Sequence, residues 1–403
     1  MQMHRHTNTK SRAIGFAVAV TLAVGLSACS NAESSAPAVS VLPIPTQLDI
    51  IVSVHANAPA PALPIELKAT VDAAITASAP ISVIALDGNP EVIYSSGPYK
   101  ISQVNPTATN DDITAQETAL LAAVSSAKAD SNGSNLGLAV RVAKDQSTAV
   151  NVSNPTIIII DSGLPDTGTP NLTDPGMTVA DPAEVASMVK QRDGLPDLTG
   201  STIELVGFGY TAAPQAQLTG TQLENIAQIW EESFKRMNAT TVTVLPVPRS
   251  GNGPDTTFTT KTVEVSADPT PNLIEVSLHP LIYGDGSSLG FQPGTADFRE
   301  AAAAKATLDS IALWLTGSPT HIATIIGTTA GTDTLESQIH LGQLRADAVA
   351  RELLNRGCTA AQITATGVGT QWPGYVNDVR ADGTLDPGIA ALNRTTQITL
   401  GTR

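Results

Sequence analysis

The sequence is poor in cysteine, in aromatic residues and in charge. Its 403 residues include two cysteines, 3% aromatic residues and 15% charged residues. Two cysteines do not make a disulfide framework, because Cys29 belongs to the motif described next and Cys358 then has no partner. Acidic residues outnumber basic ones, and the formal net charge is −15. A surface of that sign disfavours nucleic acid and anionic lipid, so we expect no nucleic-acid partner.

The N-terminus has the pattern of a secretion signal. Residues 4–12 are basic, residues 13–26 are almost wholly apolar, and a small-residue segment ending in Cys29 follows. The apolar run is shorter than the roughly 20 residues that cross a bilayer, and the three features together are typical of a signal peptide. The segment Leu26-Ser-Ala-Cys29 resembles the lipobox of bacterial lipoproteins, which implies lipidation of Cys29. We therefore predict an exported cell-envelope protein anchored to a membrane by lipid; the alternative is an ordinary signal peptide with a chance cysteine.

The composition and hydrophobic pattern of the rest of the chain predict a tether, two domains and a linker. After the signal peptide at 1–29, residues 30–46 are rich in Ala, Ser and Pro and predict a flexible tether. In residues 47–248, apolar runs alternate with helical patterns. This alternation predicts an α/β domain with a doubly wound, mostly parallel sheet covered on both faces. One of its helices, with apolar residues from Leu223 to Phe234, is expected to begin with a capping box of Thr221 and Glu224.

A second, smaller α/β domain is expected at the C-terminal end. Residues 249–264, which contain several Pro and Gly, predict a linker before it. Residues 265–403 then show helical spacing from Phe298 to Leu315, with Asp297 as the expected N-cap. Further elements are expected as a strand at 322–326, a helix at 335–356 and strands at 363–366 and 395–400.

The second domain resembles the OmpA-like peptidoglycan-binding family over about residues 270–403. The similarity lies in the segment from Ile322 to Thr329, the helix segment Leu341-Gly-Gln-Leu-Arg-Ala346, and the later Gly367-Val-Gly369. The resemblance implies binding of the diaminopimelate of a stem peptide, by an acid for its ammonium and an arginine for its carboxylate. That chemistry is sound, because a zwitterionic head needs an anion beside a planar cation with two parallel donors.

The match to the family's ligand residues is incomplete. Arg345 occupies the position of the family's arginine, but Ala330 stands where the family has its acid, and Asp333 is the candidate substitute in the same loop. Gln338 replaces the family's helix asparagine, and one arginine is missing after Arg394. The candidate ligand-binding residues are therefore Thr329, Asp333, Gln338, Arg345, Asn393 and Arg394.

Two functions follow from this resemblance. The first is a cell-envelope lipoprotein that binds peptidoglycan stem peptides non-covalently and tethers a membrane to the cell wall. Losing a charged hydrogen bond to a ligand costs roughly 1.5–3 kcal/mol, which is enough to turn weak binding into none. The alternative is therefore an envelope adaptor or scaffold with an OmpA-like fold that has lost peptidoglycan binding.

The first domain resembles a von Willebrand factor A-type domain. Residues 134–139 are similar to that family's turn into a helix, and residues 158–163 to its strand followed by Asp and Gly. The resemblance implies a metal site, but His55-Ala-Asn57 lacks the carboxylate and hydroxyls that hard cations need. We expect no metal and no cofactor; the alternative is a transition metal held by His55, Asn57, Ser134 and Asp161. The edge formed by His55, Ser134 and Asp161 is expected to face a protein partner.

One segment fits a catalytic motif. Gly286-Ser-Ser288-Leu-Gly290 has the spacing of a nucleophile elbow, which needs a strand before it and a helix immediately after it. Pro293 and Gly294 follow and disfavour that helix. We expect a loop and a protein that is not an enzyme; an esterase with Ser288 as nucleophile is the competing hypothesis.

Overall fold

The N-terminal region, residues 44–248, is built on a six-stranded sheet. The computed structural model describes residues 44–98, 100–102, 104–265, 267–270 and 279–403. The sheet order is β3-β2-β1-β4-β5-β6, and every neighbouring pair is parallel except β2 with β3. The strands are β1 (Leu48–Ser53), β2 (Ile81–Leu86), β3 (Glu91–Ser96), β4 (Thr156–Ile160), β5 (Thr202–Val206) and β6 (Thr241–Leu245). The doubly wound, mostly parallel sheet predicted from the sequence is confirmed.

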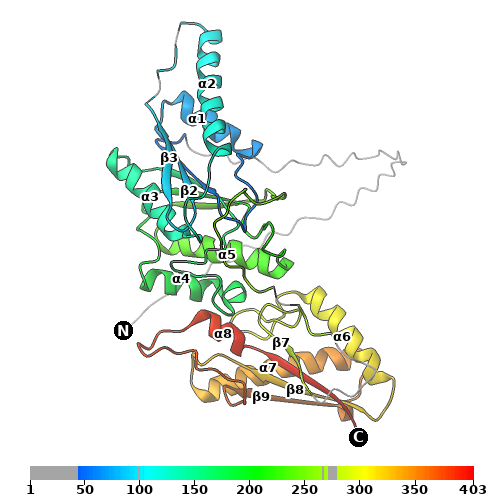
Figure 1. The fold of residues 1–403 in the computed structure, drawn as a ribbon. Coiled ribbons are helices and arrows are strands. Elements are labelled where there is room, and N and C mark those ends of the chain that lie inside the picture. The colour runs from blue at the N-terminus through cyan, green and yellow to red at the C-terminus, as the bar shows by residue number, and fades with distance from the viewer. Residues whose placement is uncertain (1–43, 99, 103, 266, 271–278) are drawn as a thin grey trace, which may run out of the picture. The chain divides into compact units, whose positions relative to one another are not determined.

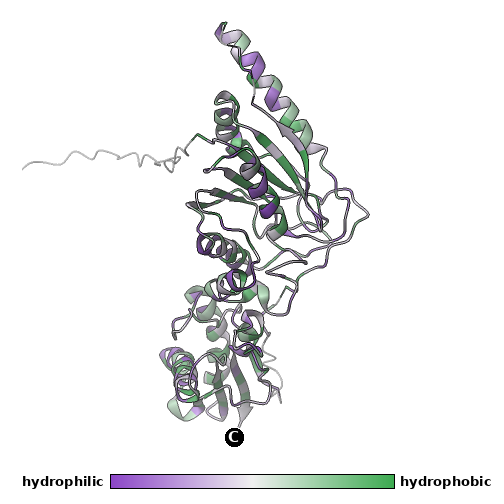
Figure 2. Cartoon of the chain, turned by 90° about the vertical axis from the view of Figure 1, so that its left-hand side faces the viewer, coloured by the Kyte–Doolittle hydropathy of each residue, from purple (hydrophilic) through white to green (hydrophobic). Residues whose placement is uncertain are grey.

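Helices cover both faces of this sheet (Figure 1). One face packs against α3, α4 and α5 through residues such as Val140, Val189 and Trp230, and the other against α1 and α2 through Val71 and Val124. The central strands are buried along their whole length and appear as apolar ribbons in Figure 2. Two buried faces explain their nearly continuous runs of Ile, Leu and Val. The helices are α1 (Lys68–Thr76), α2 (Pro106–Ser125), α3 (Leu136–Ala149), α4 (Pro182–Gln191) and α5 (Gly220–Arg236).

The C-terminal region, residues 279–403, has a smaller mixed sheet of order β7-β10-β8-β9. Strand β10 is antiparallel to β7 and β8, whereas β8 and β9 are parallel. Helices α6 and α7 pack on it through a core that includes Leu308, Ile311 and Val349. The elements are β7 (Leu281–Tyr283), α6 (Ala301–Thr316), β8 (His321–Thr328), α7 (Leu335–Asn355), β9 (Ile363–Gly369), α8 (Pro387–Asn393) and β10 (Thr396–Thr402).

Two helix starts differ from the sequence-based expectation. Helix α5 begins with a capping box of Thr219 and Gln222, two residues before the expected pair. The hydroxyl of Thr219 accepts from the Gln222 amide, so Thr221 already lies inside the helix. Helix α6 begins after Glu300 without a side-chain cap, and the backbone amide of Asp297 instead bonds to Thr295. At both helix starts several residues could act as the cap, and the local hydrogen bonds determine where the helix begins.

Residues 249–264, expected to be a linker, are hydrogen-bonded along the N-terminal region. The amides of Thr259, Lys261 and Val263 donate to Asn132, Asp166 and Gln215 at 2.7–2.8 Å. Ala391 of α8 in turn packs into the core formed around α4 and α5. The described residues form one compact unit, and the division into two domains with these boundaries stays a prediction.

The predicted signal peptide, Cys29 and most of the predicted tether lie outside the described residues. Within the described part of the chain, none of the helices combines the length and the hydropathy that crossing a bilayer requires.

Candidate functional site

A polar pocket lies at the end of β8 and the start of α7. It has a volume of about 210 Å³ and is lined by arginine and carboxylate side chains together with the loop between these elements. Five of the six residues predicted from the sequence line it: Thr329, Asp333, Gln338, Arg345 and Arg394. The sixth, Asn393, does not. These five predicted residues are up to 65 positions apart in the chain, from Thr329 to Arg394.

Helix α7 presents its pocket residues because it lies very close to the sheet. A Cβ on Gly342 would lie 2.5 Å from the carbonyl oxygen of Gly327 on β8, and one on Gly367 would lie 2.0 Å from the amide of Gln343. Gln338 and Arg345 are seven residues apart, which is two helical turns, so both lie on the pocket side of α7. Thr334 caps the helix by accepting from the Ser337 amide. Glycine at the contacts thus lets the helix bring its cation to the pocket.

Arg345 is a buried cation that lacks a carboxylate partner of its own. Its side chain is only 4% exposed, its Nε donates to the carbonyl oxygen of Thr295 at 2.9 Å, and its guanidinium lies 5.3 Å from the ring centre of Phe291. Its Nη1 and Nη2 have no hydrogen-bond partner within the described residues. Burial lowers the pKa of Arg345 to about 10, with the attraction of Asp285 acting against it. It remains charged at neutral pH and is available to a ligand carboxylate.

Asp285 and Arg299 complete the charged side of the pocket, and neither was singled out in the sequence. Asp285 Oδ1 lies 3.4 Å from Arg299 Nη2, and its Oδ2 lies 3.6 Å from Arg394 Nη1. Burial raises the pKa of Asp285, opposed by these two arginines and by Arg345. Charged residues make up only 15% of the chain, so Arg299, directly after the apolar Phe298, could have been noticed in the sequence as a candidate site residue. Asp285 sits in a Gly-Asp-Gly turn that carries no such signal.

Arg394 is paired with a carboxylate from the N-terminal region. Its Nη2 donates to Oε1 of Glu184, which lies in the first turn of α4, and Asp181 at the N-cap of α4 also lines the pocket. Burial alone would lower the pKa of Arg394, but Glu184 and Asp285 outweigh it and raise the pKa. No sequence pattern pointed to Asp181 or Glu184, because they are more than 130 residues from the C-terminal motif that begins at Ile322.

The position of the family's acid is closed by a methyl group. Ala330 is 4% exposed and lines the pocket, whereas Asp333 is exposed just before α7 and its carboxylate makes no ion pair with any described residue. Gln338 is engaged inside the protein: it donates to the carbonyl of Asp333 at 2.6 Å and accepts from Thr370 at 2.9 Å. Gln338 therefore holds the loop, and its amide is already occupied.

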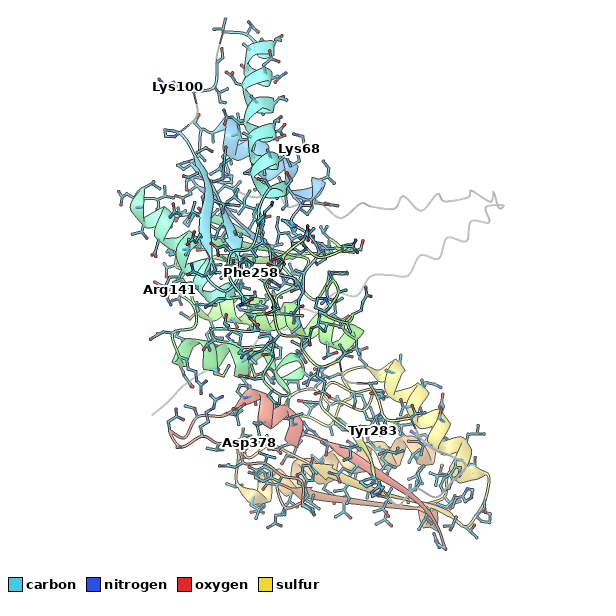
Figure 3. All side chains as sticks on the ribbon, viewed as in Figure 1. Lys68, Lys100, Arg141, Phe258, Tyr283 and Asp378 are labelled. Carbon is cyan, nitrogen blue, oxygen red and sulfur yellow. The ribbon has the colours of Figure 1, made fainter. Side chains whose placement is uncertain are left out.

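Asn393 has a structural position. It is 1% exposed, its amide nitrogen donates to the carbonyl of Val376 and to Asp378, and its amide oxygen accepts from the Val376 amide. Asp378, labelled in Figure 3, also accepts from the amide of Gly331 at 3.0 Å. Asn393 thus fixes the loop beside the pocket through Asp378, in contrast to the ligand contact expected from the sequence.

The polar residues singled out in the N-terminal region are buried. His55 Nε2 lies 2.8 Å from Asp161 Oδ1, Asn57 donates to the carbonyl of Lys261 at 2.6 Å, and Ser134 is fully buried. Burial would raise the pKa of Asp161, but His55 and the Gly163 amide outweigh it and lower the pKa. Because His55, Ser134 and Asp161 are at most 1% exposed, the expectation that they form an edge facing a partner is wrong. The part of the chain that is described contains no group of three or more His, Cys, Asp or Glu placed to hold a metal.

The segment with the nucleophile-elbow spacing is a turn. It follows β7, and the chain continues into a short bridge between Phe291 and Phe298, so no helix begins directly after Ser288. The hydroxyl of Ser288 lies 2.7 Å from that of Thr307. The strand–turn–helix geometry that exposes a nucleophile is therefore not formed here.

The comparison with family models identifies the class of the C-terminal region. Residues 290–382 match the OmpA family, a stretch that contains Thr329, Asp333, Gln338 and Arg345 but ends before Arg394. The C-terminal region therefore carries an OmpA-family domain, and the family that matches is not a catalytic one. A search of curated proteins finds no match.

Three of the solved structures similar to this chain are the following. The peptidoglycan-associated lipoprotein of Burkholderia pseudomallei is 26% identical, covers 28% of this chain and 85% of that one, and has a TM-score of 0.23. The cell wall anchor of the T6SS from Pseudomonas aeruginosa is 24% identical, with coverages of 32% and 86% and a TM-score of 0.25. A MotB-like protein of Desulfovibrio vulgaris is 22% identical, with coverages of 31% and 75% and a TM-score of 0.25. These scores are low, so the assignment of the C-terminal region rests on the family match.

Proposed function

We propose that this protein is a cell-envelope lipoprotein that binds peptidoglycan stem peptides and so tethers a membrane to the cell wall. The observation that carries the proposal is Arg345, a buried cation in a polar pocket with its Nη atoms unpaired within the described residues. A guanidinium in this state is suited to bind a carboxylate through two parallel hydrogen bonds. The OmpA-family match over residues 290–382 supports the same ligand class.

In the proposed complex, Arg345 binds the carboxylate of the diaminopimelate head. Asp333 and backbone groups of the loop are the candidates for the ammonium that the sequence motif offers, and Thr329 and Arg394 line the same pocket. The lipid on Cys29 holds the protein at the membrane. The N-terminal region, with its mostly parallel sheet, is proposed to be a von Willebrand factor A-like domain. Because His55 and Asp161 are buried, a protein partner would contact other residues of this region.

A pull-down on purified diaminopimelate-type peptidoglycan tests the proposal. The full chain carrying Cys29→Ala avoids co-sedimentation through lipid, and it is compared with the same chain carrying Arg345→Ala. We expect the first to pellet and Arg345→Ala to lose roughly tenfold or more in affinity, the size of one charged hydrogen bond. If neither binds, the wall-tether proposal fails.

Membrane attachment is tested separately. In cells, the unchanged chain is expected in the membrane fraction, and Cys29→Ala is expected in the soluble fraction because a single lipidated residue anchors it. A Cys29→Ala protein that remains with membranes would contradict the lipoprotein assignment.

The second candidate function is an envelope scaffold that no longer binds peptidoglycan. The observation that favours it is Ala330, which leaves a methyl group where the family has its acid. If Ala330→Asp pellets with peptidoglycan and the unchanged residue does not, the fold is intact and the scaffold function is supported.

A further inference from the structure

The N-terminus of helix α4 adds two carboxylates to the wall of the C-terminal pocket. Asp181 Oδ1 accepts from the amides of Ala183 and Glu184, while its Oδ2 makes no hydrogen bond with any described residue. Glu184 Oε1 accepts from Arg394, and its Oε2 is buried without a hydrogen-bond partner in the described part of the chain. Each carboxylate therefore keeps one acceptor oxygen that the protein does not use.

Other atoms of the pocket are also unsatisfied. The hydroxyl of Thr329, in a residue 4% exposed, has no hydrogen-bond partner among the described residues. Oδ2 of Asp285, whose side chain is 3% exposed, likewise accepts no hydrogen bond there and lies 3.6 Å from Arg394. Burying polar atoms without partners is costly, so a pocket lined by several of them is suited to a polar ligand.

The charges in the pocket are arranged as two poles. The unpaired Nη atoms of Arg345 form the cationic pole, because Asp285 lies against Arg299 and Arg394. Asp181 and the second oxygen of Glu184, whose first oxygen is bonded to Arg394, form the anionic pole in the same cavity of about 210 Å³. Asp333 is a weaker candidate for this pole because it is exposed, and water screens an exposed charge.

We infer that Asp181 and Glu184 take the ligand's ammonium in place of the acid that Ala330 has removed, so that the pocket binds a zwitterionic amino-acid head between α4 and Arg345. This rests on the proposed function and adds to it, since the anion comes from the N-terminal region. The binding site is then completed by two regions of the chain, and the C-terminal motif carries only its cationic half. The inference explains how a stem peptide binds without the acid at position 330.

The test uses a soluble diaminopimelate-containing stem peptide and the full chain with Cys29→Ala. The variants are Asp181→Asn, which keeps a good helix cap, Glu184→Gln, which keeps the shape, and the two together. Glu232→Gln on α5 is the matched control, because it removes one acidic charge from an exposed side chain far from α4 in sequence. Calorimetric titration measures each affinity, and thermal unfolding checks that each variant folds.

We expect the double variant to bind the peptide at least about tenfold more weakly than the chain in which Asp181 and Glu184 are unchanged. The Glu232→Gln variant should bind the peptide as tightly as that chain. The same peptide acetylated on its free diaminopimelate amine should bind weakly and equally to both proteins, because the pairing with the ammonium is already lost. Adding Ala330→Asp to the double variant should restore binding of the free-amine peptide. A merely structural role of Asp181 and Glu184 would give neither the dependence on the amine nor the rescue.

The outcomes separate this inference from the proposed function. If the unchanged chain binds and Glu184→Gln with Asp181→Asn binds equally well, the inference is overturned while wall binding stands. If the double variant binds more tightly, the inference is also overturned, because Glu184 then competes with the ligand carboxylate for Arg394. If the unchanged chain does not bind at all, both the proposed function and the inference fail.

Discussion

The two regions of the molecule treat buried charge differently. In the N-terminal region, His55 and Asp161 are both buried and bonded to each other at 2.8 Å, so each is the other's main polar partner, while His55 Nδ1 has no hydrogen-bond partner among the described residues. In the C-terminal region, Arg345 is almost as buried, but among the described residues it bonds only to a carbonyl, and its side chain lines a cavity. A paired buried charge indicates structure, and an incompletely paired one beside a cavity indicates a site.

The largest expected effect comes from breaking the buried pair of His55 and Asp161. His55→Ala leaves the Asp161 carboxylate buried without its main partner, and we expect a loss of about 3–5 kcal/mol in the free energy of unfolding. Urea-induced unfolding measures it. Lys68→Ala, which removes a half-exposed cation paired with Asp72 and Glu117, is the control and should cost far less, because water screens an exposed ion pair. Equal losses in the two variants would show that burial does not determine how much these ion pairs contribute to the free energy of unfolding.

The second prediction concerns a buried acid of the N-terminal region that has no partner at all. Both carboxylate oxygens of Glu204 on β5 are buried without a hydrogen bond within the described chain, and burial raises the pKa of Glu204 to about 7. The folded protein therefore holds a proton that the unfolded chain releases near its ordinary pKa of 4.5. Stability falls as pH rises from about 4.5 to 7 and then levels off, by roughly 3 kcal/mol for such a shift.

Glu204→Gln should remove this part of the pH dependence. Thermal unfolding at pH 5 and pH 8 measures it: the variant should gain stability relative to the natural residue at pH 8 and little at pH 5. Asp49, with a pKa raised to about 6 by burial, leaves a smaller decline of the same sign in the variant. An unchanged pH profile would mean that Glu204 is solvated or paired in solution.

The smallest expected effect on stability concerns Arg345, the incompletely paired cation of the C-terminal region. Arg345→Met keeps a long apolar side chain against Phe291 and removes a cation that makes one hydrogen bond, to Thr295. Replacing a buried charge by a packed apolar residue is often close to neutral, so we expect a change within about 1 kcal/mol in unfolding. Peptidoglycan binding should nevertheless be lost. A loss of stability as large as that of His55→Ala would make Arg345 a structural cation.

Much of the fold could be predicted because the pattern of buried residues is local. Strands β1, β2, β4 and β5 have nearly continuous apolar runs, interrupted by a few polar residues such as Asp49 and Glu204, and two buried faces require such runs. Edge strand β3 alternates between exposed and half-buried residues, and the long helix α2 buries few of its residues, so neither stands out in the sequence. The start of α5 was misplaced by two residues because Thr219 and Thr221 are both followed by a possible partner three residues on.

The candidate site also contains residues that a local sequence motif predicts and residues that it does not. Arg345, Thr329, Asp333 and Gln338 lie on one loop and helix that the sequence marks with a recognisable motif, and they do line one pocket. Asn393 was expected there and instead bonds to Val376 and Asp378. Residues from three separate segments were not foreseen: Asp285, Arg299 and the pair Asp181 and Glu184. Their distance along the chain gives no periodicity or motif to detect.

The sequence by itself determined the α/β class, the parallel sheet and the OmpA-like motif, because strand and helix periodicities are properties of neighbouring residues. Tertiary structure alone decided which charges are paired. It placed His55 against Asp161 and Glu184 against Arg394, residues separated by 106 and 210 positions. Side-chain charges interact strongly only within a few ångströms, and which distant segments come that close depends on how α4, α8 and the two sheets pack.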